Sequence, residues 1–146
     1  MAERTQAELE IAATPARIMA TIADIDQYPT WCPGVSSARV LAEFPDGRPR
    51  EVEMIFDSGP IHDTHVYRYD LWGDREVRWH LIKGETVTGL WGVYSCHTLE
   101  PRRTLVAYRL AMDLAVPIIG ALKRRAEKVI VRTALLGLRD RIESAP

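Results

Sequence analysis

Histidine is the side chain best suited to moving protons near neutral pH, and this 146-residue chain contains four histidines. His65 and His97 fall in the apolar register of two alternating segments, so we expect both to face the interior. A buried imidazole there is a candidate general base for an aldol-type cyclisation, a reaction that also needs a group to stabilise an enolate. His62 and His80 fall in the opposite register and are expected at the surface.

The histidines and cysteines do not form the pattern of a metal site. His62 and His65 lack the glutamate and the i,i+4 spacing of a helical zinc motif. In a strand, residues three apart point to opposite faces, so these two cannot hold one ion. Cys32 and Cys96 are expected to be buried free thiols, with a reactive nucleophile as the alternative. We therefore predict no metal and no other cofactor.

The segments that must position these side chains alternate apolar and polar residues, a pattern that predicts strands. We expect strands over 6–13, 35–44, 50–57, 61–72, 76–83, 87–100 and 104–114. Thr14 is a suitable N-cap and Pro15 a suitable first residue for a short helix over 15–24, and a turn-rich segment after it has room for one helical turn. From Pro117 the apolar period changes to 3.6 residues, which predicts one long helix over about 117–142.

This order of elements predicts an α+β fold of the helix-grip type. A curved antiparallel sheet of six to seven strands would wrap around the C-terminal helix, with two short helices after the first strand. One apolar face of such a sheet must be covered, and only the C-terminal helix is long enough to do so. A helix laid across a strongly curved sheet can leave an internal pocket. The length of the chain predicts a single domain over 1–146.

The apolar register of each strand predicts which side chains line that pocket. The strand residues expected there are Met54, Phe56, Tyr67, Tyr69, Trp79, Leu81, Trp91, Val93, His97, Tyr108 and Met112. Helix residues expected to close the pocket are Leu122, Ala126, Val129, Ile130 and Thr133. Apolar walls with a few polar tips are typical of a ligand site, since Tyr and Trp prefer a hydrogen-bond partner when buried. The alternative is that these residues simply form the protein core.

Four local motifs accompany this arrangement. They are Thr14-Pro15 before the first helix, Tyr28-Pro29-Thr30-Trp31, Thr98-Leu99-Glu100-Pro101 before the last strand, and Pro117 followed by Lys123-Arg124-Arg125-Ala126-Glu127. Over nearly its whole length the chain thereby resembles the START-like (SRPBCC, helix-grip) superfamily, in particular its polyketide cyclase/dehydrase and lipid-transport family. The resemblance implies that Trp31 lies at the entrance of the cavity. The motifs are structural, and members of the family include lipid carriers, quinone-binding proteins and aromatase/cyclases.

Composition and charge exclude several other classes of protein. The chain is 47% hydrophobic and 27% charged with a formal net charge of −1, which excludes general disorder and argues against a nucleic-acid partner. The sequence contains neither an apolar stretch near the roughly 20 residues of a membrane span nor a signal-peptide core in residues 1–10, so a cytoplasmic location is expected. Residues 117–146 carry seven Lys/Arg against three Asp/Glu. That excess is either a solvated helix face or a surface for transient contact with anionic membranes.

Three functions remain open at this stage. The favoured one is binding or transport of a hydrophobic small molecule such as a lipid, fatty acid, quinone or polyketide-like aromatic, by a monomer or homodimer. The second is a polyketide aromatase/cyclase or dehydratase, with His97 and His65 as candidate bases and Tyr67, Tyr69 or Arg109 as enolate-stabilising groups. The third is a regulatory or growth-affecting interaction protein with a vestigial pocket. The first is favoured because the sequence shows no catalytic triad and no metal site.

Overall fold

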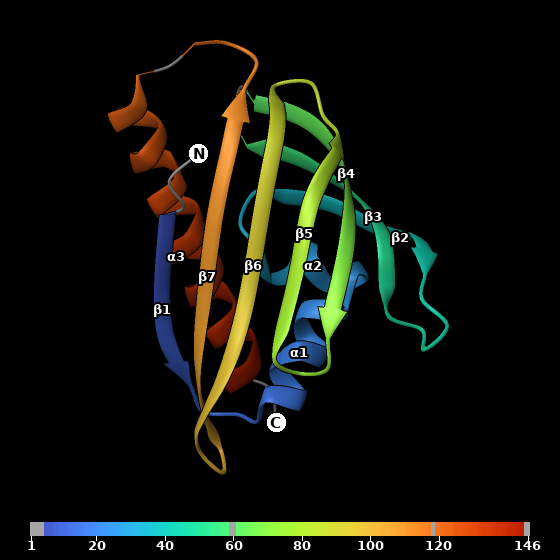
Figure 1. Cartoon of the computed structure of the whole chain (residues 1–146), viewed down its shortest axis with the longest axis vertical. Helices are drawn as coiled ribbons and strands as arrows, with labels where there is room; N and C mark the ends of the chain where they lie inside the picture. Colours follow the sequence, from blue (N-terminus) through green and yellow to red (C-terminus); the bar gives the residue numbers. More distant parts are fainter. Residues whose placement is uncertain (1–4, 59–60, 118, 145–146) are drawn as a thin grey trace.

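Seven strands form one curved antiparallel sheet in the computed structural model, which describes residues 5–58, 61–117 and 119–144 (Figure 1). The strands are β1 (Thr5–Ile11), β2 (Val35–Glu43), β3 (Pro49–Ser58), β4 (Ile61–Trp72), β5 (Glu76–Lys83), β6 (Val87–Glu100) and β7 (Arg103–Leu114). Their spatial order is β1-β7-β6-β5-β4-β3-β2, so β2 to β7 form a meander and β1 completes one edge beside β7. The predicted curved antiparallel sheet is confirmed.

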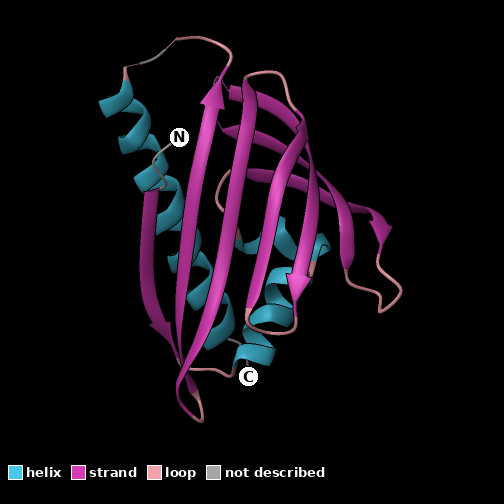
Figure 2. Ribbon diagram, viewed as in Figure 1, coloured by secondary structure: helices cyan, strands magenta, loops and turns pink. Residues whose placement is uncertain are grey.

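The helices follow the first strand and the last. They are α1 (Pro15–Ala23), the 3-10 helix η1 (Ile25–Gln27), α2 (Tyr28–Trp31) and α3 (Gly120–Ser144). Figure 2 shows all of them on the same side of the sheet, with α3 running along β1 and β7. The Thr14 hydroxyl accepts a hydrogen bond from the Arg17 N–H at 3.2 Å, which confirms the predicted cap of α1. The helix-grip arrangement, with two short α-helices and one long one, is therefore as expected, and the 3-10 helix η1 lies between the two short ones in the chain.

The long helix α3 begins at Gly120, three residues later than the predicted range 117–142. The chain bends at residues 115–116, where the Ala115 N–H still donates to the Thr86 carbonyl at 2.9 Å. The first helical hydrogen bonds are accepted by the Ile119 carbonyl, at 3.0 and 3.1 Å. Continued pairing next to β6 thus delays the helix.

The buried face of α3 begins with a carboxylate. Glu127 is 1% exposed and accepts hydrogen bonds from the Thr5 hydroxyl at 2.7 Å and the Met112 N–H at 3.0 Å. The other buried residues of α3 are Val131, Ala134, Leu135, Leu138 and Ile142. Glu127 therefore ties α3 to both β1 and β7, and its oxygens are satisfied where they are buried.

The predicted closing stripe of α3 is wrong in its placement. Leu122, Ala126, Val129 and Ile130 are exposed, and Thr133 is half-buried. The apolar period suggested that these positions face the sheet, but the partners of Glu127 turn a neighbouring face inward. None of the helices in the described part of the chain is long and apolar enough to cross a membrane.

Candidate functional site

All five tyrosines of the chain are buried in the core, four of them on strands of the sheet and one on a helix. Tyr28 lies on α2, Tyr67 and Tyr69 on β4, Tyr94 on β6 and Tyr108 on β7, and each is 2–6% exposed. We call these five tyrosines, together with Trp31 and Trp79, the aromatic cluster. Its members come from four strands and from α2, so only the folded chain brings them together.

Ring contacts join most of the cluster into one body. The Tyr94 and Tyr108 centroids lie 4.5 Å apart, and Trp79 lies 5.3 Å from Tyr94, 5.5 Å from Tyr108 and 5.7 Å from Tyr69. These separations are typical of tilted and offset aromatic pairs. Trp31 extends the cluster toward α2, where its ring lies 4.7 Å from that of Tyr28.

The polar tips of the cluster are only partly satisfied within the protein. The Tyr28 hydroxyl donates to the Ile22 carbonyl at 2.5 Å. The Trp31 indole N–H is buried without a hydrogen-bond partner among the described residues. Buried polar groups normally have partners, so the cluster retains unused hydrogen-bonding capacity.

Burial keeps the cluster uncharged. It is the main cause that raises the pKa of every one of the five tyrosines above its usual value. Burial also raises the pKa of the Cys32 thiol, next to Trp31 in the chain, to about 12. At neutral pH these groups are therefore neutral donors and acceptors in an apolar wall.

A hydrogen-bonded chain of three buried side chains lies along β4. Asp63, His65 and Tyr67 occupy alternate positions on the helix-covered face and are all buried. His65 Nε2 lies 2.9 Å from Asp63 Oδ2, and His65 Nδ1 lies 2.5 Å from the Tyr67 hydroxyl. This Asp63–His65–Tyr67 chain connects a carboxylate to the aromatic cluster through an imidazole.

The turn between β5 and β6 holds the carboxylate of this chain. The backbone N–H groups of Glu85, Thr86 and Val87 donate to Asp63 at 3.1, 3.0 and 3.2 Å. Burial opposes ionisation of Asp63, but the hydrogen bonds from Glu85 and Val87, followed by His65, outweigh it and lower the pKa. Asp63 is therefore an ionised, fully engaged acceptor at neutral pH.

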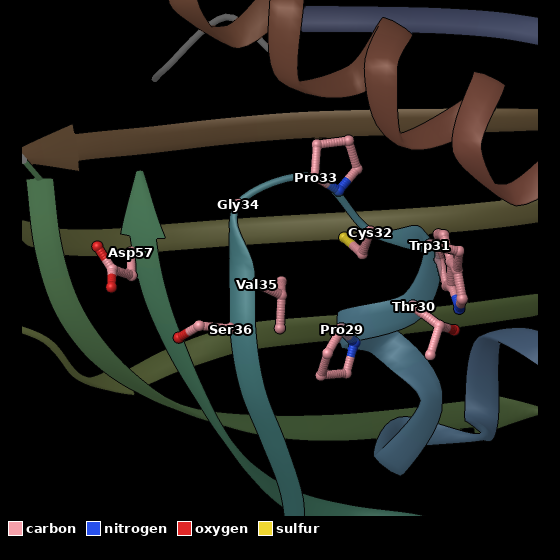
Figure 3. A pocket seen from close by; sticks show the side chains of 9 residues that line it. All are labelled: Pro29, Thr30, Trp31, Cys32, Pro33, Gly34, Val35, Ser36 and Asp57. Atoms are coloured by element: carbon pink, nitrogen blue, oxygen red, sulfur yellow. The ribbon is translucent and has the colours of Figure 1, made fainter. Parts of the chain in front are cut away.

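A pocket of about 370 Å³ lies at the connection between α2 and β2 (Figure 3). It is lined by Pro29, Thr30, Trp31, Cys32, Pro33, Gly34, Val35, Ser36 and Asp57. Trp31 and Val35 are also buried members of the core, so the pocket borders the aromatic cluster from outside. Figure 3 shows α3 passing above Pro33.

A family model described as polyketide cyclase/dehydrase and lipid transport matches residues 2–143. The chain belongs to this family. A comparison with curated protein sequences gives no match.

Several solved structures are similar in fold to this member of the polyketide cyclase/dehydrase and lipid-transport family. A START superfamily protein from Mycobacterium smegmatis is 20% identical with a TM-score of 0.90, and the match covers 97% of each chain. The Zhui aromatase/cyclase from Streptomyces sp. R1128 is 16% identical with a TM-score of 0.77, over 98% of this chain and 94% of that one. A conserved protein from Geobacillus kaustophilus is 11% identical with a TM-score of 0.82, over 97% and 96%. At these identities the likeness shows the START-like fold alone.

Most of the strand residues predicted to face inward in this family member do so. Met54, Tyr67, Tyr69, Trp79, Tyr108 and Met112 are buried in the core, as are His65 and Trp31, while Phe56 and Leu81 are partly buried against it. His62 and His80 are exposed, as expected. In the described residues, no group of three or more His, Cys, Asp or Glu side chains is arranged to hold a metal ion.

The predicted register of β6 is wrong. Trp91 is 43% exposed and His97 is exposed, while Val93 is buried but lies outside the core cluster. The inward positions are Leu90, Gly92, Tyr94 and Cys96. Apolar residues occupy both registers of this strand, and Gly92 interrupts the inward register in the sequence. In the structure, the ring of Trp79 fills the space above Gly92.

Three residues of the site are missing from the sequence-based prediction: Asp63, Tyr28 and Tyr94. Asp63 shares the register of His65 and Tyr67, which was the one available signal. An acidic residue in an apolar register looks like a surface residue unless its partners are known. Its backbone partners lie more than twenty residues further along the chain.

Proposed function

We propose that the protein binds a hydrophobic small molecule between the sheet and α3, with the aromatic cluster as the contact surface. The observation that carries the proposal is the buried, unpartnered indole N–H of Trp31 at the edge of a cluster of buried tyrosines. Apolar contact would supply affinity at about 25 cal/mol per Å² buried. The polar tips would orient the molecule. The family and the START-like fold support this function without naming the ligand.

The remaining inward side chains would complete the ligand's surroundings. Met54, Phe56, Leu81 and Met112 lie on the same side of the sheet as the cluster. We propose the pocket at the α2–β2 connection as the entrance, since Trp31 belongs both to its wall and to the core.

Binding of a fluorescent apolar probe, N-phenyl-1-naphthylamine, tests the function. We expect saturable binding with one molecule per chain. Replacing Trp31 by Phe should weaken binding several-fold, because it removes the unpartnered N–H and part of the wall. Trp91→Phe is the matched control, since Trp91 is 43% exposed on the opposite face. Absence of saturable binding would contradict the proposal and favour the interaction-protein alternative.

The Asp63–His65–Tyr67 chain favours a second candidate function, catalysis of proton transfer in a cyclase or dehydratase. A carboxylate, an imidazole and a phenol in hydrogen-bond contact can pass a proton to or from a bound carbonyl compound. His65 is the candidate base, while His97 is exposed and remote from this chain of contacts. Deuterium exchange into a 1,3-diketone, followed by NMR, should be accelerated by the protein and not by His65→Ala. An equal rate with and without protein removes this candidate.

Contact with an anionic membrane is proposed for α3, because a hydrophobic cargo must enter and leave through an apolar phase. Leu122 and Val129 are 48% and 57% exposed, and Glu127, the one acidic residue of 119–132, is buried. The basic residues of that stretch are Lys123, Arg124, Arg125, Lys128 and Arg132. Interleaved apolar and basic side chains suit an anionic bilayer surface.

Vesicle flotation tests the membrane contact. The protein should float with vesicles that contain about one third phosphatidylglycerol and not with pure phosphatidylcholine. The double variant Leu122→Ser, Val129→Ser should lose this binding, while Leu41→Ser, at an exposed position on β2, should keep it. Equal behaviour of the two variants would contradict the proposed surface.

A further inference from the structure

We infer that residues 29–34 form a lid at the entrance of the proposed binding site, and that Arg141 of α3 latches this lid. The inference rests on the proposed binding function and names how access to its site is regulated. It follows from the lining of the α2–β2 pocket, from the burial of the segment and from its contacts with α3 (Figure 3).

Trp31 separates the pocket at the α2–β2 connection from the rest of the aromatic cluster. Trp31 lines that pocket, whereas none of the five tyrosines, all of which the structure describes, does so. The Trp31 ring also lies 4.7 Å from the ring of Tyr28, and both rings are buried. A molecule in this pocket therefore reaches the cluster only when Trp31 moves aside.

The lid is attached to the core by one side chain. Trp31 is 8% exposed and Cys32 is half-buried, while the other four lid residues are exposed. The neighbours on either side, Tyr28 and Val35, are buried and serve as fixed ends. Gly34, with φ +83°, turns the chain into β2, and glycine adopts such a φ without strain. A short segment with so little buried apolar surface is typical of those that open locally while the domain stays folded.

The closed lid carries an energetic cost at Trp31. Its indole N–H is buried without a hydrogen-bond partner in the part of the chain that the structure describes. An unsatisfied buried donor destabilises the closed state, and water supplies an acceptor once the lid opens. Opening therefore exposes an apolar ring but restores a hydrogen bond, which lowers the free energy that opening requires.

Arg141 holds the lid from α3. Its Nη1 donates to the Thr30 hydroxyl at 3.2 Å, and its Nη2 donates to Gln27 Oε1, just before the lid, at 3.3 Å. Thr30 and Arg141 are both exposed. At Gly137, α3 comes close to the Trp31 carbonyl but has no side chain to interlock with the lid. The latch therefore consists of surface hydrogen bonds that can break without disturbing the core.

Labelling of the two cysteines by N-ethylmaleimide, followed over a day by peptide mass spectrometry, measures opening of the lid without any ligand. Cys32 lies in the lid, whereas Cys96 is buried on β6 and reports unfolding of the sheet. We expect Arg141→Gln to label at Cys32 about two- to ten-fold faster than the wild type, the value of about one net hydrogen bond. The rate at Cys96 should not change.

Arg139→Gln is the matched control for the latch. It removes the same charge from α3, and within the described residues Arg139 makes no side-chain hydrogen bond to the lid. Its labelling rates should therefore equal those of the wild type.

Stopped-flow binding of N-phenyl-1-naphthylamine connects the lid to the site. A lid that closes again over the bound molecule changes both rates and not the equilibrium, because Arg141→Gln removes the latch from the free and the bound closed states alike. We expect this variant to raise the association and dissociation rates of the probe by the factor seen at Cys32, with Kd unchanged. Arg139→Gln should leave both rates as they are.

An unchanged labelling rate at Cys32 in Arg141→Gln would overturn the latch, and an equal rise at Cys96 would overturn the lid by showing general destabilisation. Faster labelling without faster probe binding would overturn the lid as the ligand's route and leave the binding function intact. Absence of saturable probe binding by the wild type would contradict the binding function itself, and the lid as a regulator of binding would fall with it.

Discussion

The indole ring of Trp79 lies directly over the backbone of Gly92, and a Cβ on Gly92 would stand 2.3 Å from the ring atoms Cε2 and Cζ2. Trp79 is held by Tyr69 on one side and by Tyr94 and Tyr108 on others, so it has little room to move. The position therefore requires glycine for space rather than for backbone freedom.

We expect Gly92→Ala to lower the free energy of unfolding by roughly 1–3 kcal/mol, the usual range for overpacking a filled core. Urea denaturation followed by far-UV circular dichroism measures it. Gly89→Ala on the same strand is the control, because its close neighbours are the ends of the exposed Asp113 and Trp91 side chains. An equal effect of both substitutions would show that the loss of stability comes from replacing a strand glycine in general and not from the contact with Trp79.

Gly137→Ala should also destabilise the protein, although alanine is favoured over glycine in a helix by about 1 kcal/mol. A Cβ on Gly137 would stand 2.4 Å from the Trp31 carbonyl oxygen, a backbone atom that cannot rotate away. We expect a net loss of roughly 1–3 kcal/mol in thermal or urea unfolding. Gly120→Ala, whose Cβ would meet only the flexible Arg124 side chain, should be neutral or stabilising. A stabilising Gly137→Ala would mean that α2 and α3 separate at little cost.

Asp63→Asn should destabilise the protein at neutral pH and much less in acid. Folding lowers the pKa of Asp63, so its stabilisation is complete above the unfolded-state pKa and is lost as the pH falls through the folded-state value. We expect a deficit of roughly 1–3 kcal/mol for the variant at about pH 7 that shrinks toward pH 3. Urea unfolding at both pH values measures it, and Asp26→Asn at an exposed position is the control. A deficit independent of pH would contradict the ionised state of Asp63.

Both cysteines should resist alkylation in the folded protein. Burial raises the pKa of Cys32 and Cys96 to about 12, so only about one thiol in ten thousand is ionised near pH 8. Mass spectrometry after iodoacetamide treatment should find both unmodified without denaturant and modified in urea. A surface cysteine introduced as Ala20→Cys should react under both conditions. Rapid labelling of native Cys32 would show that the α2–β2 connection opens readily.

Strand β4 illustrates which structural features can be predicted from the sequence. Only one register of β4 carries His65, Tyr67 and Tyr69, so the inward face could be assigned from alternation alone. The predicted strands, the cap at Thr14 and the long last helix depend on equally local signals, and they are confirmed within a few residues.

Strand β6 and helix α3 show where local signals end. Apolar side chains occupy both registers of β6, and what decides between them is the Trp79 ring on the neighbouring strand. On α3 the inward face is determined by Glu127, whose burial depends on its hydrogen bonds with Thr5 and with the Met112 N–H. Residues distant in the chain therefore determine which face of each element turns inward, and the local periodicity carries no information about those residues.

The pairing of β1 with β7 also sets an order of events during folding. Residues 5–11 pair with 104–110, so the loop that must close is about a hundred residues long. A ribosome has to deliver β7 before β1 finds its neighbour, and α3 before Glu127 can join the two strands. Until then the nascent chain shows the tyrosine-bearing face of its meander to the surroundings. Contacts between segments so distant in the sequence slow folding, and the yield in the cell should depend on how well that face is protected while synthesis finishes.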